Sequence, residues 1–560
     1  MSPNTPSGPS EGPYDAASGS GEGRPEYLGD APDAPAAPSG PAKRWPVLGA
    51  VAVGVAAAVG LGGWGAFALL SGGGAQPAEA LPADAVAYAS LDLDPSASQK
   101  IEAFKILKKF PGLQKELGLD TTDDLRRLVF KEIQDEGDCK KLDYDSDIEP
   151  WIGERIAVAA VPSGGKADSG APVVALQVTD PDAAEKGIQT LADCGEAEAD
   201  FGYAFSDDYV LVTDSQKRAD ALVADAAESS LADDDSFQEW TGKVGDPGIL
   251  TMYAAPGAPE YFQRMQEDMG QGIAGSDAMY GLSMEPAAAR TGDQMEDLAK
   301  NFKGMAGTVR FDDGAVEAEF AADGLPAGMS SDGETSGPRL ADLPASTGAA
   351  LSVGLPEGWL DKSMESMAGV LGSGESMDEM WAEGERETGL TLPEDIETVL
   401  GDGVSLSFDA DTDLEALFES DDPSALPIGL RIAGDSDEIV PIIEKIKTAI
   451  GPDADMLVVE ASDGGVAVGL NSDYVNALVE GGGLGDEDSF QRVIPDPDKA
   501  TAAAYVNFDA GDGWAEQLAD SLGDGDSAEA RENVAPLDAL GMSSWVDGDV
   551  QRGLFRLTTD

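Results

Sequence analysis

The stretch LADDDSFQ at residues 231–238 recurs as LGDEDSFQ at residues 484–491. Each copy has a leucine, an acidic run and Ser-Phe-Gln in the same order. Identity at six of eight positions in one chain indicates an internal repeat. The rest of the sequence can therefore be compared outward from these two points.

Further matches precede and follow the two copies in the same order. Leu-Pro-Ala opens an apolar run at residue 81 and again at residue 343. The other matched pairs are a helical turn ending at glycine (147–154 and 395–402), a strand leading to a helix capped by aspartate (Asp180 and Asp435), a hairpin (206–208 and 462–465) and a final strand (314–323 and 551–560).

These matches predict two tandem, diverged α+β repeats with mainly antiparallel sheets. Several neighbouring strands are joined by tight turns, which parallel strands cannot use. We place the first repeat at residues 81–324 and the second at 343–560. Residues 325–342 (LPAGMSSDGETSGPRLAD) have the composition of a linker.

An uncharged apolar stretch precedes the repeats. Residues 47–70 (VLGAVAVGVAAAVGLGGWGAFALL) contain no charged side chain and are long enough to cross a bilayer. Lys43 and Arg44 precede it, and no basic residue follows until Lys100. The sequence thus predicts a transmembrane signal anchor at residues 45–71 in the cell membrane, with the N-terminus cytoplasmic and the C-terminal domain extracytoplasmic.

The segments on either side of the predicted anchor have little capacity to form a core. Residues 1–44 are rich in Pro, Gly, Ser and Ala, which predicts a disordered cytoplasmic tail. Residues 72–80 are expected to be a linker. A signal peptide cleaved after Ala80 is the alternative to an anchor, although its apolar region would be unusually long.

The composition excludes several classes of function. The 560 residues include 106 acidic and 35 basic ones, for a formal charge of -71, so we expect no nucleic-acid partner. The chain has no histidine, the commonest general base and metal ligand. We therefore expect no cofactor, no metal and no enzymatic activity. The two cysteines, Cys139 and Cys194, both follow the apolar stretch and predict one disulfide.

Two local patterns suggest contacts with ions or surfaces. One is a basic amphipathic helix near the predicted anchor, in residues 100–118, with lysines at Lys100, Lys105, Lys108, Lys109 and Lys115. It would contact anionic lipid headgroups or anionic wall polymers, or else pair with the acidic body of the protein.

The other pattern is an acidic run with the spacing of a calcium-binding EF-hand loop, formed by Asp143, Asp145, Asp147 and Glu154. The sixth position of such a loop requires glycine and here holds Ile148. A second run at 409–413 has Leu414 at the same position. Neither run is assigned as a metal site.

Several of these motifs resemble a family of bacterial, often actinobacterial, membrane-anchored proteins of unknown function (DUF3352-like). The resemblance rests on Leu81-Pro82-Ala83, Tyr88-Ala89-Ser90, Pro150-Trp151-Ile152-Gly153, Ser230-Leu231 and Phe237. It implies an exported, anchored protein and supplies no site residues. We expect a non-enzymatic binding or scaffold module of the cell envelope. The alternatives are a carrier of a lipid or other hydrophobic ligand and, less favoured, a hydrolase that uses carboxylates alone.

Overall fold

The computed structural model describes most of the chain from Gln76 onward, within one compact unit, Trp45–Asp560. The described residues are 76–93, 97–110, 126–127, 130, 143–163, 171–192, 201–269, 298–325, 334–356, 358–360, 377–411, 422–511, 513–515, 517 and 527–560. The predicted tail at 1–44, residues 72–75 of the predicted linker at 72–80 and both cysteines lie outside them.

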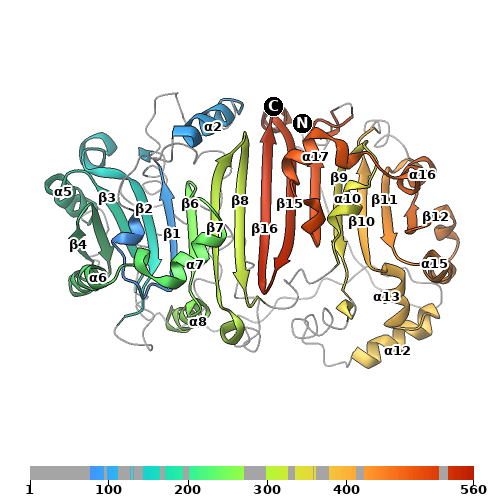
Figure 1. Ribbon diagram of the computed structural model, residues 1–560, viewed down its shortest axis with the longest axis horizontal. Helices are drawn as coiled ribbons and strands as arrows, with labels where there is room; N and C mark the ends of the chain where they lie inside the picture. Colours follow the sequence, from blue (N-terminus) through green and yellow to red (C-terminus); the bar gives the residue numbers. More distant parts are fainter. Residues whose placement is uncertain are drawn as a thin grey trace, which may run out of the picture. The chain divides into compact units, whose positions relative to one another are not determined.

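In the described part of the chain, sixteen strands form a single sheet (Figure 1). They are β1 (Ala87–Asp92), β2 (Ile152–Ala160), β3 (Val173–Val178), β4 (Gly202–Ser206), β5 (Tyr209–Thr213), β6 (Leu250–Ala254), β7 (Gly304–Asp312), β8 (Ala315–Asp323), β9 (Thr347–Gly354), β10 (Gly403–Asp409), β11 (Ile428–Ala433), β12 (Val458–Ser462), β13 (Gly465–Gly469), β14 (Ala502–Asn507), β15 (Leu537–Asp547) and β16 (Val550–Thr559).

The helices connect these strands and pack on the sheet. The α-helices are α2 (Ala97–Leu107), α5 (Pro181–Ala192), α6 (Gln216–Glu228), α7 (Asp235–Lys243), α8 (Ala258–Met269), α10 (Gly337–Ala341), α12 (Met377–Thr388), α13 (Glu394–Leu400), α15 (Ser436–Ile450), α16 (Ser472–Glu480), α17 (Asp488–Val493) and α19 (Ser527–Val534). Short helical turns include η1 (Pro77–Glu79), the π-helical turn η2 (Tyr144–Ile148), η3 (Leu231–Asp233) and η9 (Leu484–Asp486).

The order of strands in the sheet is symmetric about its centre. It runs β12-β13-β11-β10-β9-β14-β15-β16-β8-β7-β6-β1-β2-β3-β5-β4. If β9 to β16 are matched in turn with β1 to β8, the order is the same from either end. We call residues 76–325 the first half and residues 334–560 the second half.

The predicted fold class is wrong in its separation of two units with sheets of their own. The last strands of the halves, β8 and β16, pair antiparallel, with Glu317 opposite Arg556, and merge the halves into one antiparallel sheet. An unpaired edge strand exposes a row of backbone donors and acceptors, and pairing the two edges removes both rows.

The predicted fold also included a transmembrane helix, which the structure does not support. Among the described residues, no helix is long and apolar enough to cross a membrane. The predicted span at residues 45–71 lies outside them.

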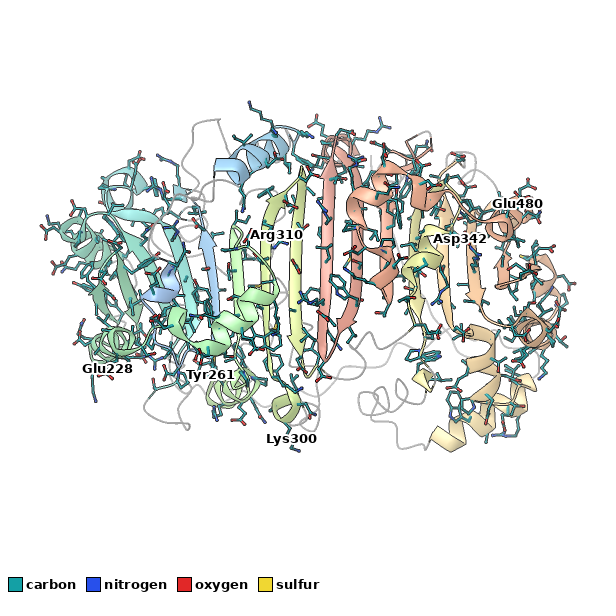
Figure 2. All side chains as sticks on the ribbon, in the orientation of Figure 1. Glu228, Tyr261, Lys300, Arg310, Asp342 and Glu480 are labelled. Atoms are coloured by element: carbon teal, nitrogen blue, oxygen red, sulfur yellow. The ribbon has the colours of Figure 1, made fainter. Side chains whose placement is uncertain are left out.

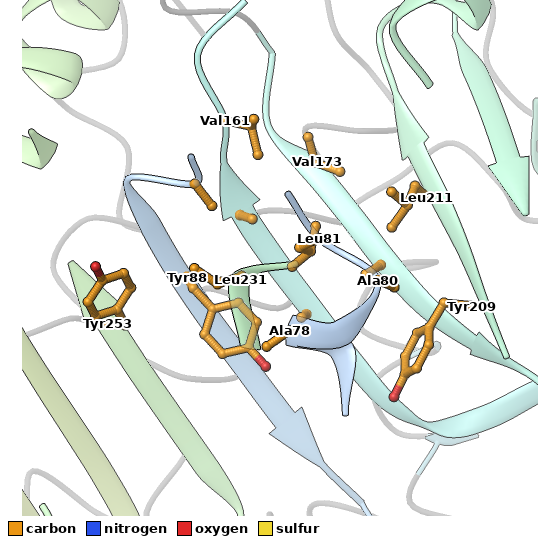
Figure 3. Close-up of a cluster of buried hydrophobic side chains, with 14 of the residues drawn as sticks. Ala78, Ala80, Leu81, Tyr88, Val161, Val173, Tyr209, Leu211, Leu231 and Tyr253 are labelled. Atoms are coloured by element: carbon orange, nitrogen blue, oxygen red, sulfur yellow. The ribbon is translucent and has the colours of Figure 1, made fainter. Parts of the chain in front are cut away.

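The sheet has two faces, which we name by the side chains they carry. The front face carries Tyr253 and Tyr505, and helices α6, α7, α16 and α17 pack on it. In the first half, Leu222 and Trp240 from these helices join one buried cluster with strand residues. Figure 3 shows Tyr88 and Tyr253 of this cluster. Glu228 and Glu480, the last residues of α6 and α16, lie near opposite ends of the sheet (Figure 2).

The back face carries Leu91 and Leu351. In the first half, α5 and η2 cover the outer strands, and α2 packs with Ala103 and Ile106 against residues of β6, β7 and β8. In the second half, Ile439 and Ile443 of α15 cover the outer strands.

Candidate functional site

The repeated motif builds the core and does not form a site. In the first copy, the Asp234 side chain accepts a hydrogen bond from Phe237 N, which begins α7. The Ser236 hydroxyl bonds the hydroxyl of Tyr253 at 3.1 Å, and the second copy repeats this contact between Ser489 and Tyr505 at 2.8 Å. The motif therefore recurs because each half fixes a helix on a buried tyrosine in the same way.

Of the predicted anionic-contact lysines, Lys100 and Lys105 belong to α2, and Lys108 and Lys109 follow its last residue, Leu107. Lys105 pairs with Glu102 at 3.2 Å, and the Lys109 ammonium donates to Thr559 Oγ1 at 2.9 Å. Lys108 is exposed, whereas Lys115 and the side chain of Lys100 lie outside the description. Ile101 is 57% exposed, because the buried stripe of α2 runs through Ala103 and Ile106.

The carboxylates of the EF-hand-like run have structural roles. Asp143 caps η2 by accepting from Ser146 N, and its own N–H donates to Asp147 Oδ2 at 2.9 Å. Asp145 pairs with Arg127. These contacts stabilise a turn.

One group of three carboxylates in the described part of the chain lies close enough together to hold a cation. Oxygens of Asp509, Asp538 and Asp560 lie within 4.8 Å of one another, close to the end of β14, the start of β15 and the end of β16. Asp538 is buried and pairs with Arg492 at 2.9 Å. Partial burial and the negative charge of Asp560 raise the pKa of Asp509 to about 6. Sequence reasoning could not find this group, because its members come from three separate segments of a very acidic chain.

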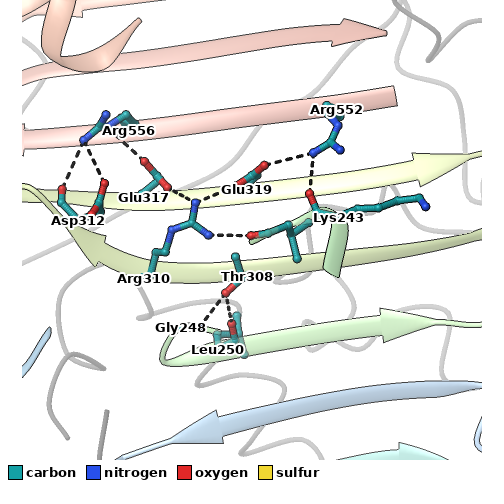
Figure 4. A network of polar contacts seen from close by, with 11 residues as sticks. Lys243, Gly248, Leu250, Thr308, Arg310, Asp312, Glu317, Glu319, Arg552 and Arg556 are labelled. Atoms are coloured by element: carbon teal, nitrogen blue, oxygen red, sulfur yellow. Dashed lines mark hydrogen bonds and ion pairs between the residues drawn. The ribbon is translucent and has the colours of Figure 1, made fainter. Parts of the chain in front are cut away.

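The front face carries a charged network where the two halves join (Figure 4). Arg310 of β7 pairs with Glu317 and Glu319 of β8, and Glu319 also pairs with Arg552 of β16 at 3.5 Å. Arg556 pairs with Glu317 at 3.4 Å. The acidic edge of the first half thus meets a basic edge of the second half.

This network also ends helix α7. Arg310 donates to the carbonyl of Val244 at 2.7 Å, and Arg552 donates to the carbonyl of Lys243 at 2.6 Å. The last carbonyls of a helix need such partners and carry partial negative charge, which a guanidinium satisfies. The network joins the halves, and its charged side chains pair with one another and with the end of α7.

The back face of the second half is different, because large apolar side chains are exposed there. Leu406, Leu351, Ala504 and Met542 lie directly opposite one another on β10, β9, β14 and β15. Three of them are strongly exposed: Leu406 by 48%, Leu351 by 49% and Met542 by 50%. We call these four residues the apolar row.

The apolar row continues toward both ends of the sheet without a charged side chain. The next back-face positions are Leu430 of β11 on one side and the half-buried Phe555 of β16 on the other. Phe320 of β8, 44% exposed, and Ile428 of β11, 39% exposed, border the row. In a chain with a formal charge of -71, this contiguous apolar surface is the strongest candidate for an interaction site in the described part of the chain.

Sequence reasoning missed this surface for a physical reason. An apolar residue at every second position of a strand predicts one buried face. Whether anything then covers that face depends on contacts far away in the sequence.

Residues 50–203 match the family described as protein of unknown function (DUF3352). The predicted resemblance to a family of unknown function is thereby confirmed. No curated protein and no solved structure matches the chain. The DUF3352 match ends within β4, so it does not include the apolar row, and it assigns no activity or ligand.

Proposed function

We propose that the protein is a non-enzymatic binding or scaffold module whose binding surface is the apolar row with its borders on the back face of the second half. The observation that supports the proposal is the exposure of Leu351, Leu406 and Met542 side by side on neighbouring strands. At about 25 cal/mol per Å², covering such side chains stabilises a complex appreciably.

The geometry favours a binding surface over an enclosed carrier site. The apolar row lies on a continuous antiparallel sheet, and its members project from successive strands in one register. Such a surface suits an elongated partner that crosses several strands. A carrier would instead enclose its ligand between helices and sheet.

The place of action stays a prediction from the sequence. We propose that the module works on the outer side of the cell membrane, as a component of the envelope. The acidic composition supports this role, because self-repulsion keeps a protein with an exposed apolar surface dispersed. Fractionation of cells, with protease treatment from outside, tests the location.

The binding surface can be tested with a neutral apolar dye and the full chain. Nile red should bind and increase its fluorescence, and Leu351→Glu or Met542→Glu should remove most of that increase. Ile450→Glu is the matched control, because Ile450 is 61% exposed at the end of α15, away from the row. Equal fluorescence from all four proteins would contradict the proposal.

A further inference from the structure

In the first half, a helix of the same chain, α2, covers part of the back face. It packs with Ala103 and Ile106 buried against residues at one end of β6, β7 and β8. Lys105 of α2 stays exposed, and Lys109, two residues after the helix, donates to Thr559 at the end of β16. The cover is therefore a short helix with an apolar side and with lysines outside the buried stripe.

In the second half the apolar row is exposed, with Leu351, Leu406 and Met542 each about half accessible. From Leu406 to Met542 the row crosses four adjacent strands, about 14 Å at the usual strand spacing. A helix of about ten residues has that length. Helix α2 has 11 residues.

The ends of these strands are acidic on both sides of the row. At one end lie Asp411, Asp509 and Asp560, and at the other lie Asp547 and Asp549, all exposed. Asp547 and Asp549 already lie near Arg552 and Lys303, at 3.5 and 4.0 Å. Positive charge on a partner would therefore be attracted mainly to the end with Asp411, Asp509 and Asp560, whereas an acidic partner would be repelled.

We propose that the partner of the apolar row is a lysine-rich amphipathic helix, laid across β10, β9, β14 and β15. This inference rests on the proposed function and specifies the chemistry of the partner. The apolar side of the helix covers Leu406, Leu351 and Met542. Its lysines face the acidic strand ends.

A second copy of the chain and a lipid bilayer are weaker candidates for the partner of the apolar row, because of the same acidic charge. Each copy has a formal charge of -71, so two apolar rows can meet only against strong repulsion. An anionic bilayer would be repelled by the same acidic ends. Both remain outcomes of the test.

The test uses the full chain and a fluorescent peptide with the sequence of residues 97–110, ASQKIEAFKILKKF. Fluorescence anisotropy should show saturable binding that weakens as salt rises from 50 to 500 mM, because salt screens the charges. Replacing the four lysines of the peptide by glutamine should weaken binding about tenfold.

Protein variants locate the peptide. Leu351→Glu and, as a second variant, Met542→Glu should each weaken peptide binding at least about tenfold by placing a charge under its apolar side. Ile450→Glu should bind like the unmodified protein. Circular dichroism confirms that each variant is folded.

The outcomes separate this inference from the proposed function. Nile red binding without peptide binding, or equal binding of the lysine and glutamine peptides, overturns the inference and leaves the binding surface intact. A dimer in sedimentation that Met542→Glu abolishes assigns the row to a second copy and also overturns it. Binding of phosphatidylcholine vesicles in place of the peptide does the same in favour of lipid. Loss of both dye and peptide binding removes the proposed function itself.

Discussion

The two halves have the same strands in the same order but differ in the side chains of their back faces. At the positions where the second half has Leu406, Leu351 and Met542, the first half has Val158, Ala89 and Gly307. The correspondence is based on the two equivalent tyrosines, because Met252 directly precedes Tyr253 in β6 as Ala504 directly precedes Tyr505 in β14.

This difference separates what the fold needs from what it does not need. The first half shows that small residues suffice at these positions to form the sheet. Large exposed apolar side chains at the same positions in the second half add little to folding and create a surface. We infer that, after the duplication, the first half has a structural role and the second half provides the binding surface.

The largest contrast in stability is expected at the turn that precedes β2 and β10. Trp151 is 1% exposed and donates from Nε1 to the Asp147 carbonyl at 2.7 Å, whereas its counterpart Val399 is only partly buried. Trp151→Ala should lower the free energy of unfolding by about 4 kcal/mol, and Val399→Ala by about 1 kcal/mol. Urea denaturation measures both. Equal losses would show that the two turns pack alike.

The join between the halves should be the next most sensitive place. The Glu317 side chain is 6% exposed between Arg310 and Arg556, so Glu317→Gln leaves both guanidinium groups with less compensation. The expected loss of unfolding free energy is about 3 kcal/mol. Glu239→Gln is the control, because the Glu239 side chain is 65% exposed and its pair with Lys243 should contribute under about 0.5 kcal/mol. Similar small losses would mean that the network does not hold the halves together.

The repeated motif should give equal effects in the two halves. Ser236→Ala and Ser489→Ala each remove a hydroxyl that bonds a buried tyrosine. Each should lower the free energy of unfolding by about 1 kcal/mol, measured by urea denaturation. A neutral result in one half alone would indicate that the two copies of the motif have diverged in role.

The smallest effect is a change in pH dependence that belongs to the second half alone. Asp509 lies near Asp538, Asp560 and Arg492, and the residue at the equivalent place in the first half is Gly257. The folded-state pKa of Asp509 is raised to about 6 from 3.8, so stability that the protonated carboxyl provides is lost as pH rises through about 6.

Asp509→Asn should remove that loss. The variant should have a higher Tm than the unmodified protein at pH 7, and the two should differ less at pH 4. Thermal unfolding at the two pH values measures the change. A lower Tm for the variant at pH 7 would show that the carboxylate is stabilising.

Local signals in the sequence predicted much of each half. The expected hairpins appear as β4–β5, with Asp207 at a φ of 46°, and as β12–β13, with Gly465 at a φ of 148°. The aspartate cap at Asp435 is also present. These features depend on a few neighbouring residues, which the sequence displays directly.

Features that depend on distant contacts could not be predicted. The pairing of β8 with β16 joins strands more than 200 residues apart in the sequence, and only the charges of Glu317 and Arg556 hint at it. Exposure of the apolar row has no sequence signal, because Leu351 and the buried Leu91 both lie in strand-like apolar runs. What covers a face is decided by helices elsewhere in the chain.

The exposure of the back face of the second half can be tested directly by methionine oxidation. Met542 is 50% exposed, whereas Met252 packs against the cluster under α2. Treatment of the folded chain with dilute hydrogen peroxide, followed by mass spectrometry, gives a rate for each. Met542 should form sulfoxide several-fold faster than Met252. A Met542 that reacts as slowly as Met252 would show that the face is covered and would contradict the account.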